Sequence, residues 1–175
     1  KKNFPGKYFD ENGAVAASGK VNEALLVALK DHSFFNEPFP KTTGPELFNL
    51  DYLQRAKEKS GTANIGHEDT MATLNRFSGE TIAVAIKIAI ANKADFHFYV
   101  SGGGMHNPEL MKNIGELLPG SNFKSTASLK INPDAKEAVL FAVLANEAIC
   151  GGSINFGKGR NGIPNVSMGK ISFPS

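Results

Sequence analysis

The chain of 175 residues contains 41% hydrophobic side chains, enough for one compact domain with its own core. Its 19 basic and 17 acidic residues nearly cancel and are spread along the sequence, which disfavours nucleic acid as a partner. The longest apolar stretch, residues 82–91, is interrupted by Lys87 and is much shorter than the ~20 residues of a membrane span. We therefore expect no membrane segment.

The reactive side chains exclude several classes of site. Cys150 is the single cysteine, so no disulfide can form within the chain, and a reducing cytoplasm fits best. The four histidines show neither a zinc-ligand spacing nor a recognisable nucleophile partner, so we expect no metal site and no hydrolase triad. The start at Lys1 carries no signal-peptide pattern, and we expect a cut piece of a longer protein.

The first half of the sequence predicts helices joined by turns. Residues 10–13 have a turn composition that predicts a short hairpin or bend. Apolar spacing predicts a helix over residues 22–32, with Asn22 as its N-cap, and a second helix that restarts at Glu46. A third, long helix is predicted for residues 68–91, where Gly79 suggests close packing. The intervening Pro-rich stretch up to Gly44 is expected to be a structured loop.

The second half predicts a strand, a glycine turn and further helices. Residues 96–100 read as a strand, and Asn107-Pro108 opens a helix that runs to about residue 118. One edge strand is expected within residues 122–129. Asn132-Pro133 opens a last helix that ends before Gly151, after which the tail is expected to run over the surface.

The glycine turn is the strongest functional feature. Gly102, Gly103 and Gly104 lie between a predicted strand and a helix start, where backbone N–H groups and the helix dipole favour anions. A plain connecting turn explains three glycines equally well without further context. A dinucleotide fingerprint is disfavoured, because its third glycine would fall on Asn107.

Other glycine-rich and charged segments are weaker candidates. The G-x-G-x-x-G at Gly157 follows no strand and precedes Pro164, so we interpret it as a chance match. No P-loop sequence occurs. Glu137, in the first turn of its helix, can simply complement the helix dipole. Residues 41–44 could contact an anionic sugar, but we favour a structural role in the turn.

Five segments carry a further signal: Asp10, Gly13, Ala16 and Gly19; Phe39-Pro40-Lys41-Thr42-Thr43-Gly44-Pro45-Glu46-Leu47-Phe48-Asn49; Ser101-Gly102-Gly103-Gly104-Met105-His106-Asn107-Pro108; Pro133-Asp134-Ala135-Lys136-Glu137-Ala138; and Ser167-Met168-Gly169-Lys170. Together they cover nearly the whole chain and resemble, in the right order, the anhydro-N-acetylmuramic acid kinase family. The loop of residues 39–49 departs from the family pattern at Phe39 and Pro45.

The resemblance implies an α/β fold, the C-terminal lobe of an actin-like (ribonuclease H-like) ATPase with a mixed sheet flanked by helices. Residues 1–175 would form that single lobe, and the N-terminal lobe of the family would be absent. The family uses ATP with Mg²⁺ and water to convert 1,6-anhydro-N-acetylmuramic acid to N-acetylmuramic acid 6-phosphate during peptidoglycan recycling. Such phosphoryl transfer depends on positioning and electrostatics.

The resemblance also assigns residues. Gly102, Gly103, Gly104 and Asn107 would line the adenosine pocket, and Glu137 would face the amino sugar. The catalytic aspartate lies upstream in the family, so no catalytic residue is expected here and the chain alone should be inactive. The expected partners are the sugar and the missing N-terminal lobe, and a homodimer is left open. The alternatives are a non-catalytic nucleotide-binding or interaction module and a kinase for another sugar.

Overall fold

The structure is a computed structural model that describes residue 6, residues 8–91 and residues 96–150. The chain divides into two compact units, Lys1–Phe98 with Gly103–Phe123, and Tyr99–Gly102 with Lys124–Ser175. The helices and strands are α1 (Ala14–Ser18), α2 (Glu23–Lys30), α3 (Leu50–Lys59), α4 (His67–Ile90), β1 (Phe98–Val100), α5 (Pro108–Leu117), β2 (Phe123–Ser125) and α6 (Lys136–Cys150), with 3-10 turns η1 (Glu11–Gly13), η2 (Ser33–Asn36), η3 (Gly103–His106) and η4 (Thr126–Leu129).

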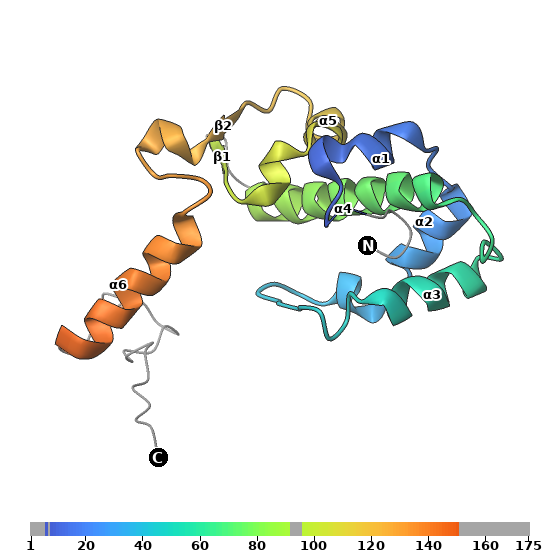
Figure 1. The fold of residues 1–175 in the computed structure, drawn as a ribbon, viewed down its shortest axis with the longest axis horizontal. Coiled ribbons are helices and arrows are strands. Elements are labelled where there is room, and N and C mark those ends of the chain that lie inside the picture. Colours follow the sequence, from blue (N-terminus) through green and yellow to red (C-terminus); the bar gives the residue numbers. More distant parts are fainter. Residues whose placement is uncertain (1–5, 7, 92–95, 151–175) are drawn as a thin grey trace, which may run out of the picture. The chain divides into compact units, whose positions relative to one another are not determined.

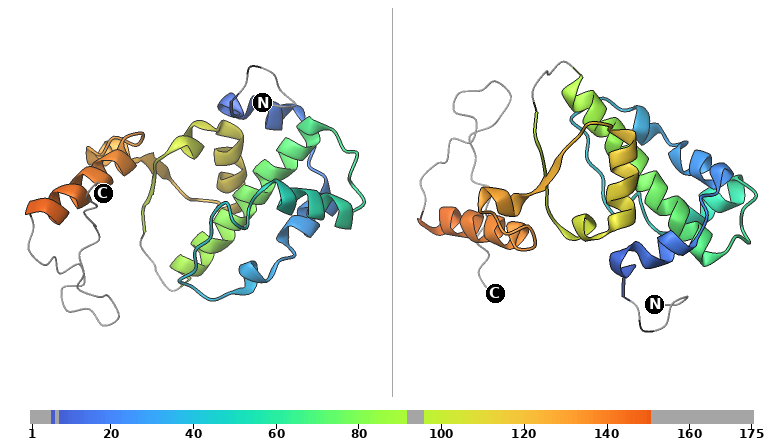
Figure 2. Two further views of the ribbon diagram at one scale, coloured as in Figure 1. Left: turned by 60° about the horizontal axis from the view of Figure 1, so that its bottom comes forward. Right: turned by 90° about the horizontal axis from the view of Figure 1, so that it is seen from above.

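Helix α4 is the centre of the first unit, and α1, α2 and α5 all pack against it, while α3 packs against α2. Figure 1 shows α1 and α5 along one side of the long green helix and α2 with α3 along the other, and the views in Figure 2 agree. The predicted close packing at Gly79 is confirmed: a Cβ placed there would lie 2.9 Å from Cβ of Asn113 in α5.

Asparagine caps determine where three helices begin. Asn22 accepts a hydrogen bond from the N–H of Leu25, and Asn107 accepts one from Leu110, so both predicted N-caps are confirmed. The predicted helix restart at Glu46 is wrong, because α3 begins at Leu50 behind the cap Asn49. The Glu46 carboxylate instead accepts from the N–H of Gly44 at 2.6 Å and closes a turn before the helix.

Two apolar clusters flank α4. Leu25, Leu29 and Ala56 form a buried cluster on the α2–α3 side, against which Phe77 of α4 packs. Ala83 of α4 forms the second cluster with the α5 residue Ile114 and with Leu118, which directly follows α5. Burying each of the leucine and isoleucine side chains contributes roughly 1.5–3 kcal/mol. The hydrophobic core of this unit is therefore built on both sides of one helix.

The bend predicted at residues 10–13 is confirmed, since Asn12 and Gly13 have φ values of +54° and +66°, but it leads into the helix α1 and not into a hairpin. The Asp10 carboxylate accepts hydrogen bonds from the N–H groups of Val15 (2.8 Å) and Ala16 (3.0 Å) at the start of α1. At Gly19 a Cβ would lie 2.1 Å from the carbonyl oxygen of Glu68, so only glycine allows this approach to α4. These family-like residues therefore have structural roles.

The strands make a small sheet. β1 and β2 pair in a two-stranded sheet, and the rings of Phe98 and Phe123 stack with centroids 5.0 Å apart. The strand predicted for residues 96–100 is confirmed in its last part only. The chain is an α/β protein dominated by helices, but the mixed sheet flanked by helices is not seen in the part that the structure describes. The actin-like lobe stays a prediction, as does a single lobe over residues 1–175.

The second unit contains α6. Asn132 Oδ1 accepts from the N–H of Asp134 at 2.9 Å, as expected for a helix entry. The helix nevertheless begins at Lys136 and not at Pro133, since residues 133–135 form a turn whose Pro133 carbonyl accepts from the N–H of Gly102. The sequence features at Gly157 and in residues 167–170 lie outside the described residues. No described helix is both long and apolar enough for a bilayer crossing.

Candidate functional site

Gly102 has a backbone reason to be glycine. Its φ is +81°, a left-handed value that side chains rarely tolerate. Its N–H donates to the carbonyl of Pro133 at 3.0 Å, within the second unit. This N–H is therefore occupied, and Gly102 serves the turn itself.

Gly103 and Gly104 differ from Gly102, because neither is among the glycines with positive φ. Both are exposed at the start of η3, where the first N–H groups of a helical turn have no partner within it. A Cβ at Gly103 would meet no atom within 4 Å, and one at Gly104 would make an ordinary 3.5 Å contact with Leu110. Within the described part of this unit, no neighbouring atom requires glycine at position 103.

Asn107 lies next to this turn, but its side chain points to the helix and not away from it. Its Oδ1 accepts from the N–H of Leu110 (3.0 Å) and from Nδ2 of Asn75 in α4 (3.3 Å). A Cβ at Gly13, where φ is +66°, would lie 2.3 Å from the same oxygen. The structure thus gives Asn107 the role of an α5 cap enclosed by α4 and Gly13. Its predicted contact with adenosine stays a prediction.

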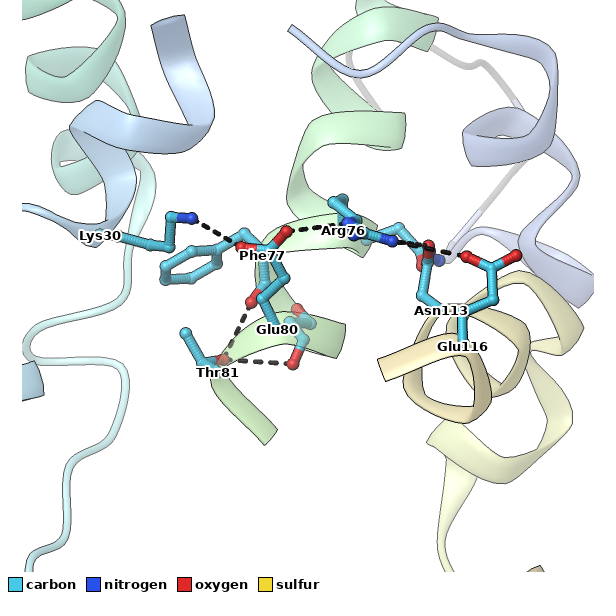
Figure 3. Close-up of polar contacts among 9 residues, drawn as sticks. Lys30, Arg76, Phe77, Glu80, Thr81, Asn113 and Glu116 are labelled. Atoms are coloured by element: carbon cyan, nitrogen blue, oxygen red, sulfur yellow. Dashed lines mark hydrogen bonds and ion pairs between the residues drawn. The ribbon is translucent and has the colours of Figure 1, made fainter. Parts of the chain in front are cut away.

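A polar network behind Asn107 was not found by sequence reasoning. Asn113 donates from Nδ2 to Oδ1 of Asn75 at 2.9 Å, and both side chains are buried. Arg76 donates from Nη1 to Oδ1 of Asn113 at 3.2 Å and from Nε to Glu80 at 2.9 Å. Figure 3 shows Arg76 reaching from α4 towards Asn113 and Glu116 on α5. The available signal was weak: Asn75 shares a helix face, at steps of three or four, with the small residues Ala72, Gly79 and Ala83, and all four are buried.

Glu80 ends this network on the α2 side, where its Oε2 accepts from Nζ of Lys30 at 2.6 Å. Partial burial opposes ionisation of Glu80, but hydrogen bonds and charges from Lys30 and Arg76 together outweigh it. They hold the pKa of the Glu80 carboxyl below its ordinary value. The carboxylate therefore stays ionised between two cations at neutral pH.

A groove of about 600 Å³ lies on the other face of α4, within the first unit. Its wall includes the rings of Phe35, Phe48 and Phe77, whose centroids are 5.7 to 6.0 Å apart, with Lys30 and Glu80 at its edge. Phe77 packs edge-to-face against both other rings, an arrangement that adds to the stabilisation from buried apolar area. None of the residues assigned to ATP or to the sugar by the family resemblance lines this groove, whereas Lys41 of the loop at residues 41–44 does.

Lys41 has the structural role that we favoured for residues 41–44. Its Nζ donates to the carbonyls of Phe34 (2.6 Å) and Phe35 (3.0 Å). The same ammonium lies over the rings of Phe34 and Phe39, 4.8 Å and 5.2 Å from their centroids. The Lys41 ammonium group therefore stabilises its own loop through these carbonyl and ring contacts.

Glu137 lies in the first turn of α6 and is exposed, as expected for an acid that complements the helix dipole. It belongs to the second unit, whereas Gly103, Gly104 and Asn107 belong to the first. Its assignment to the sugar stays a prediction. Within the described ranges, no three His, Cys, Asp or Glu side chains are grouped so that they could hold a metal ion.

Comparison with known proteins gives consistent matches. The family model described as anhydro-N-acetylmuramic acid kinase matches residues 1–173. The anhydro-N-acetylmuramic acid kinase of Pseudoalteromonas atlantica is 52% identical over 175 residues, which is 99% of this chain and 44% of that protein. The enzyme of the same name from Pseudoalteromonas translucida is 47% identical over 171 residues, or 97% of this chain and 43% of that protein.

A more distant relative agrees: the Hahella chejuensis protein of the same name is 41% identical over 136 residues, covering 78% of this chain and 35% of its own length. The chain thus spans less than half the length of the curated relatives that it matches. This coverage does not confirm the prediction that the chain is the C-terminal half. It does confirm the family resemblance, because the family model extends over almost every residue: the chain belongs to the anhydro-N-acetylmuramic acid kinase family.

Proposed function

We propose that this chain is the nucleotide-binding part of a cytoplasmic kinase that acts on 1,6-anhydro-N-acetylmuramic acid. The complete enzyme would use ATP, Mg²⁺ and water to open the anhydro ring and form N-acetylmuramic acid 6-phosphate in peptidoglycan recycling. The chain would be the C-terminal, actin-like lobe, and the catalytic aspartate would lie in the part upstream. The names of the relatives, at up to 52% identity, support the reaction class.

The observation that carries the proposal is the open glycine position at 103. Exposed N–H groups at the start of η3 and the nearby N-terminus of α5 offer donors and a favourable dipole to an anionic or polar ligand. Gly103 leaves space in front of the backbone, since a Cβ there would meet nothing within 4 Å. The open backbone here suits a polar or anionic group of ATP, and the family resemblance supports the adenosine side in particular. ATP when bound supplies the phosphoryl group, and this chain supplies the surface that holds it.

The proposal is tested by calorimetry of ATP binding to the full-length protein with Gly103→Val and Gly115→Val. A Cβ has open space at both positions, so the two variants are matched. We expect Gly103→Val to weaken ATP binding by about tenfold or more, because even a 1.4 kcal/mol clash with the ligand has that effect. Gly115→Val should bind ATP like the wild type. Equal ATP affinity in both variants would favour an interaction module in which the turn only reverses the chain.

The isolated 175-residue chain is proposed to lack kinase turnover. A coupled ADP assay with the anhydro sugar should show no activity for the chain alone, and activity for the complete protein. Turnover by the chain alone that is lost in Gly103→Val would refute the proposed division of labour. A panel of amino sugars offered to the complete protein shows whether its substrate is the anhydro sugar or another sugar.

The role of Glu137 is tested separately in the complete protein. Glu137→Gln should raise KM for the sugar but not for ATP.

A further inference from the structure

The amide groups between α4 and α5 form a chain of hydrogen bonds with one direction. Arg76 donates to Asn113, Asn113 donates to Asn75, and Asn75 donates to Asn107. Asn107 uses the oxygen that receives this last bond to accept from the N–H of Leu110, the first-turn donor of α5. A partly buried guanidinium therefore stands at one end of the chain and a helix cap at the other.

The direction matters because each carboxamide has one accepting and one donating end. Arg76 has donors only, so it requires that Asn113 turns its oxygen towards α4. Asn113 then presents its NH₂ group to Asn75, and Asn75 presents its own NH₂ group to Asn107. Rotating any one of the three asparagine carboxamides by half a turn would place two donors or two acceptors against each other. The network therefore specifies the orientation of the Asn107 amide.

Asn107 joins this network to the glycine turn. Its side chain caps α5 at Leu110, and its own N–H donates to the carbonyl of Gly104 at 3.1 Å. Gly13 lies against the carboxamide on another side, since a Cβ there would overlap the oxygen. An error in the orientation of Asn107 would thus be passed to both α5 and residues 103–106.

We propose that Asn75 is a positioning residue for the glycine turn: it holds the Asn107 carboxamide in the orientation that caps α5 and keeps Gly103 and Gly104 in place for ligand. The proposal rests on the proposed nucleotide site, although Asn75 itself lies behind the turn and touches no ligand. Asn113 acts one step further back in the same chain of hydrogen bonds, and Arg76 two steps back.

The first test is Asn75→Asp in the full-length protein. Aspartate can still accept from Asn113, but it presents an oxygen to the Asn107 oxygen and loses that hydrogen bond. We expect amide hydrogen exchange at Leu110 and at Asn107, whose N–H groups are bonded to the cap and to Gly104, to accelerate by roughly tenfold, the effect of losing about one hydrogen bond. KM for ATP should rise by a similar factor, whereas kcat and KM for the sugar should stay close to the wild-type values.

The control is Phe77→Leu, on the opposite face of α4, which lowers stability without touching the network. It should leave exchange at Leu110 and KM for ATP unchanged. If Asn75→Asp merely behaved like Phe77→Leu, with a lower melting temperature but unchanged exchange at Leu110, the positioning role would be refuted.

A second variant covers the case in which Asn75→Asp does not fold. Asn113→Asp keeps a partner for its new charge, because Arg76 already donates to that oxygen at 3.2 Å. It removes the donor to Asn75, so Asn75 is expected to rotate and turn its oxygen towards Asn107. Exchange at Leu110 should again accelerate, although the substitution is two side chains away from the cap. Unchanged exchange at Leu110 would refute transmission along the chain.

Hydrogen exchange at Leu110 and the binding of ATP together distinguish a failure of the positioning role from a failure of the proposed function. If the wild-type protein binds no ATP, the proposed function and the positioning role fail together, even where Leu110 exchange responds. If the wild type binds ATP and both variants bind it equally well, only the positioning role fails. Accelerated exchange together with a raised KM for ATP in either variant supports both.

Discussion

The two faces of α4 are packed by different kinds of interaction. The face towards α5 carries Asn75, Arg76 and Gly79, whose contacts are hydrogen bonds with defined donors and a close backbone approach. The face towards α2 and the loop between α2 and α3 carries Phe77, whose ring packs edge-on against Phe35 and Phe48. The face towards α5 is therefore held by directional hydrogen bonds, and the face towards α2 mainly by the burial of apolar area.

This difference means that one face mainly determines the geometry of the site and the other mainly determines the free energy of unfolding. A buried hydrogen bond adds only about 1 kcal/mol net, but leaving one partner unsatisfied costs more, so geometry is tightly specified. Aromatic contacts bury more area and tolerate volume-conserving changes. The directional face is also the one connected to the glycine turn. We therefore expect the aromatic face to dominate the free energy of unfolding and the polar face to dominate the geometry of the site.

The largest expected effect is on the aromatic face. Phe77→Ala should lower the free energy of unfolding by about 3 kcal/mol, the lower end for a Phe truncation, because the ring is only half-buried. Phe77→Leu, which keeps most of the volume, should cost less than about 1.5 kcal/mol. Urea denaturation followed by circular dichroism measures both. Equal losses for the two variants would contradict the view that this face responds to volume alone.

The second largest effect is expected where α4 and α5 approach closely at Gly79. In Gly79→Val the new side chain starts 2.9 Å from Cβ of Asn113, so α5 must move away from α4. Overpacking of this kind should cost about 2 kcal/mol. Gly115→Val on α5 is the control, since a Cβ there meets nothing within 4 Å. Chemical denaturation of the pair gives the comparison, and a Gly79→Val protein as stable as its control would show that the helices separate without cost.

Local signals in the sequence were sufficient to locate most elements. The caps at Asn22 and Asn107 and the apolar repeat of α4 involve neighbours within a few positions, which a sequence displays directly. The start of α3 was missed, because Glu46 forms a turn with Gly44 that competes with the helix. For the entry of α6 the predicted start at Pro133 was wrong, because the Pro133 carbonyl is bonded to Gly102, far away in sequence.

The candidate site shows the same limit. The glycine turn could be found from its composition, but the reason for each glycine could not, since only coordinates distinguish the positive φ of Gly102 from the open space at Gly103. The network of Asn75, Asn107 and Asn113 joins positions separated by more than thirty residues. No local pattern specifies which amide donates to which, so this part of the site required the fold.

The smallest expected effect concerns Glu80, which links the two faces through Arg76 and Lys30. Its pKa in the folded protein lies below the ordinary 4.5, so its contribution to stability is present above pH 4.5 and is lost as the pH falls through the folded value. At neutral pH, Glu80→Gln should be less stable than wild type by no more than about 1 kcal/mol, because the pair is partly exposed and screened by solvent. The difference in melting temperature should shrink as the pH is lowered below 4.5, where the wild-type carboxyl becomes neutral as well. A difference that stays constant down to pH 3 would mean that Glu80 acts through packing and not through its charge, and Arg76 would then orient Asn113 without help from the α2 face.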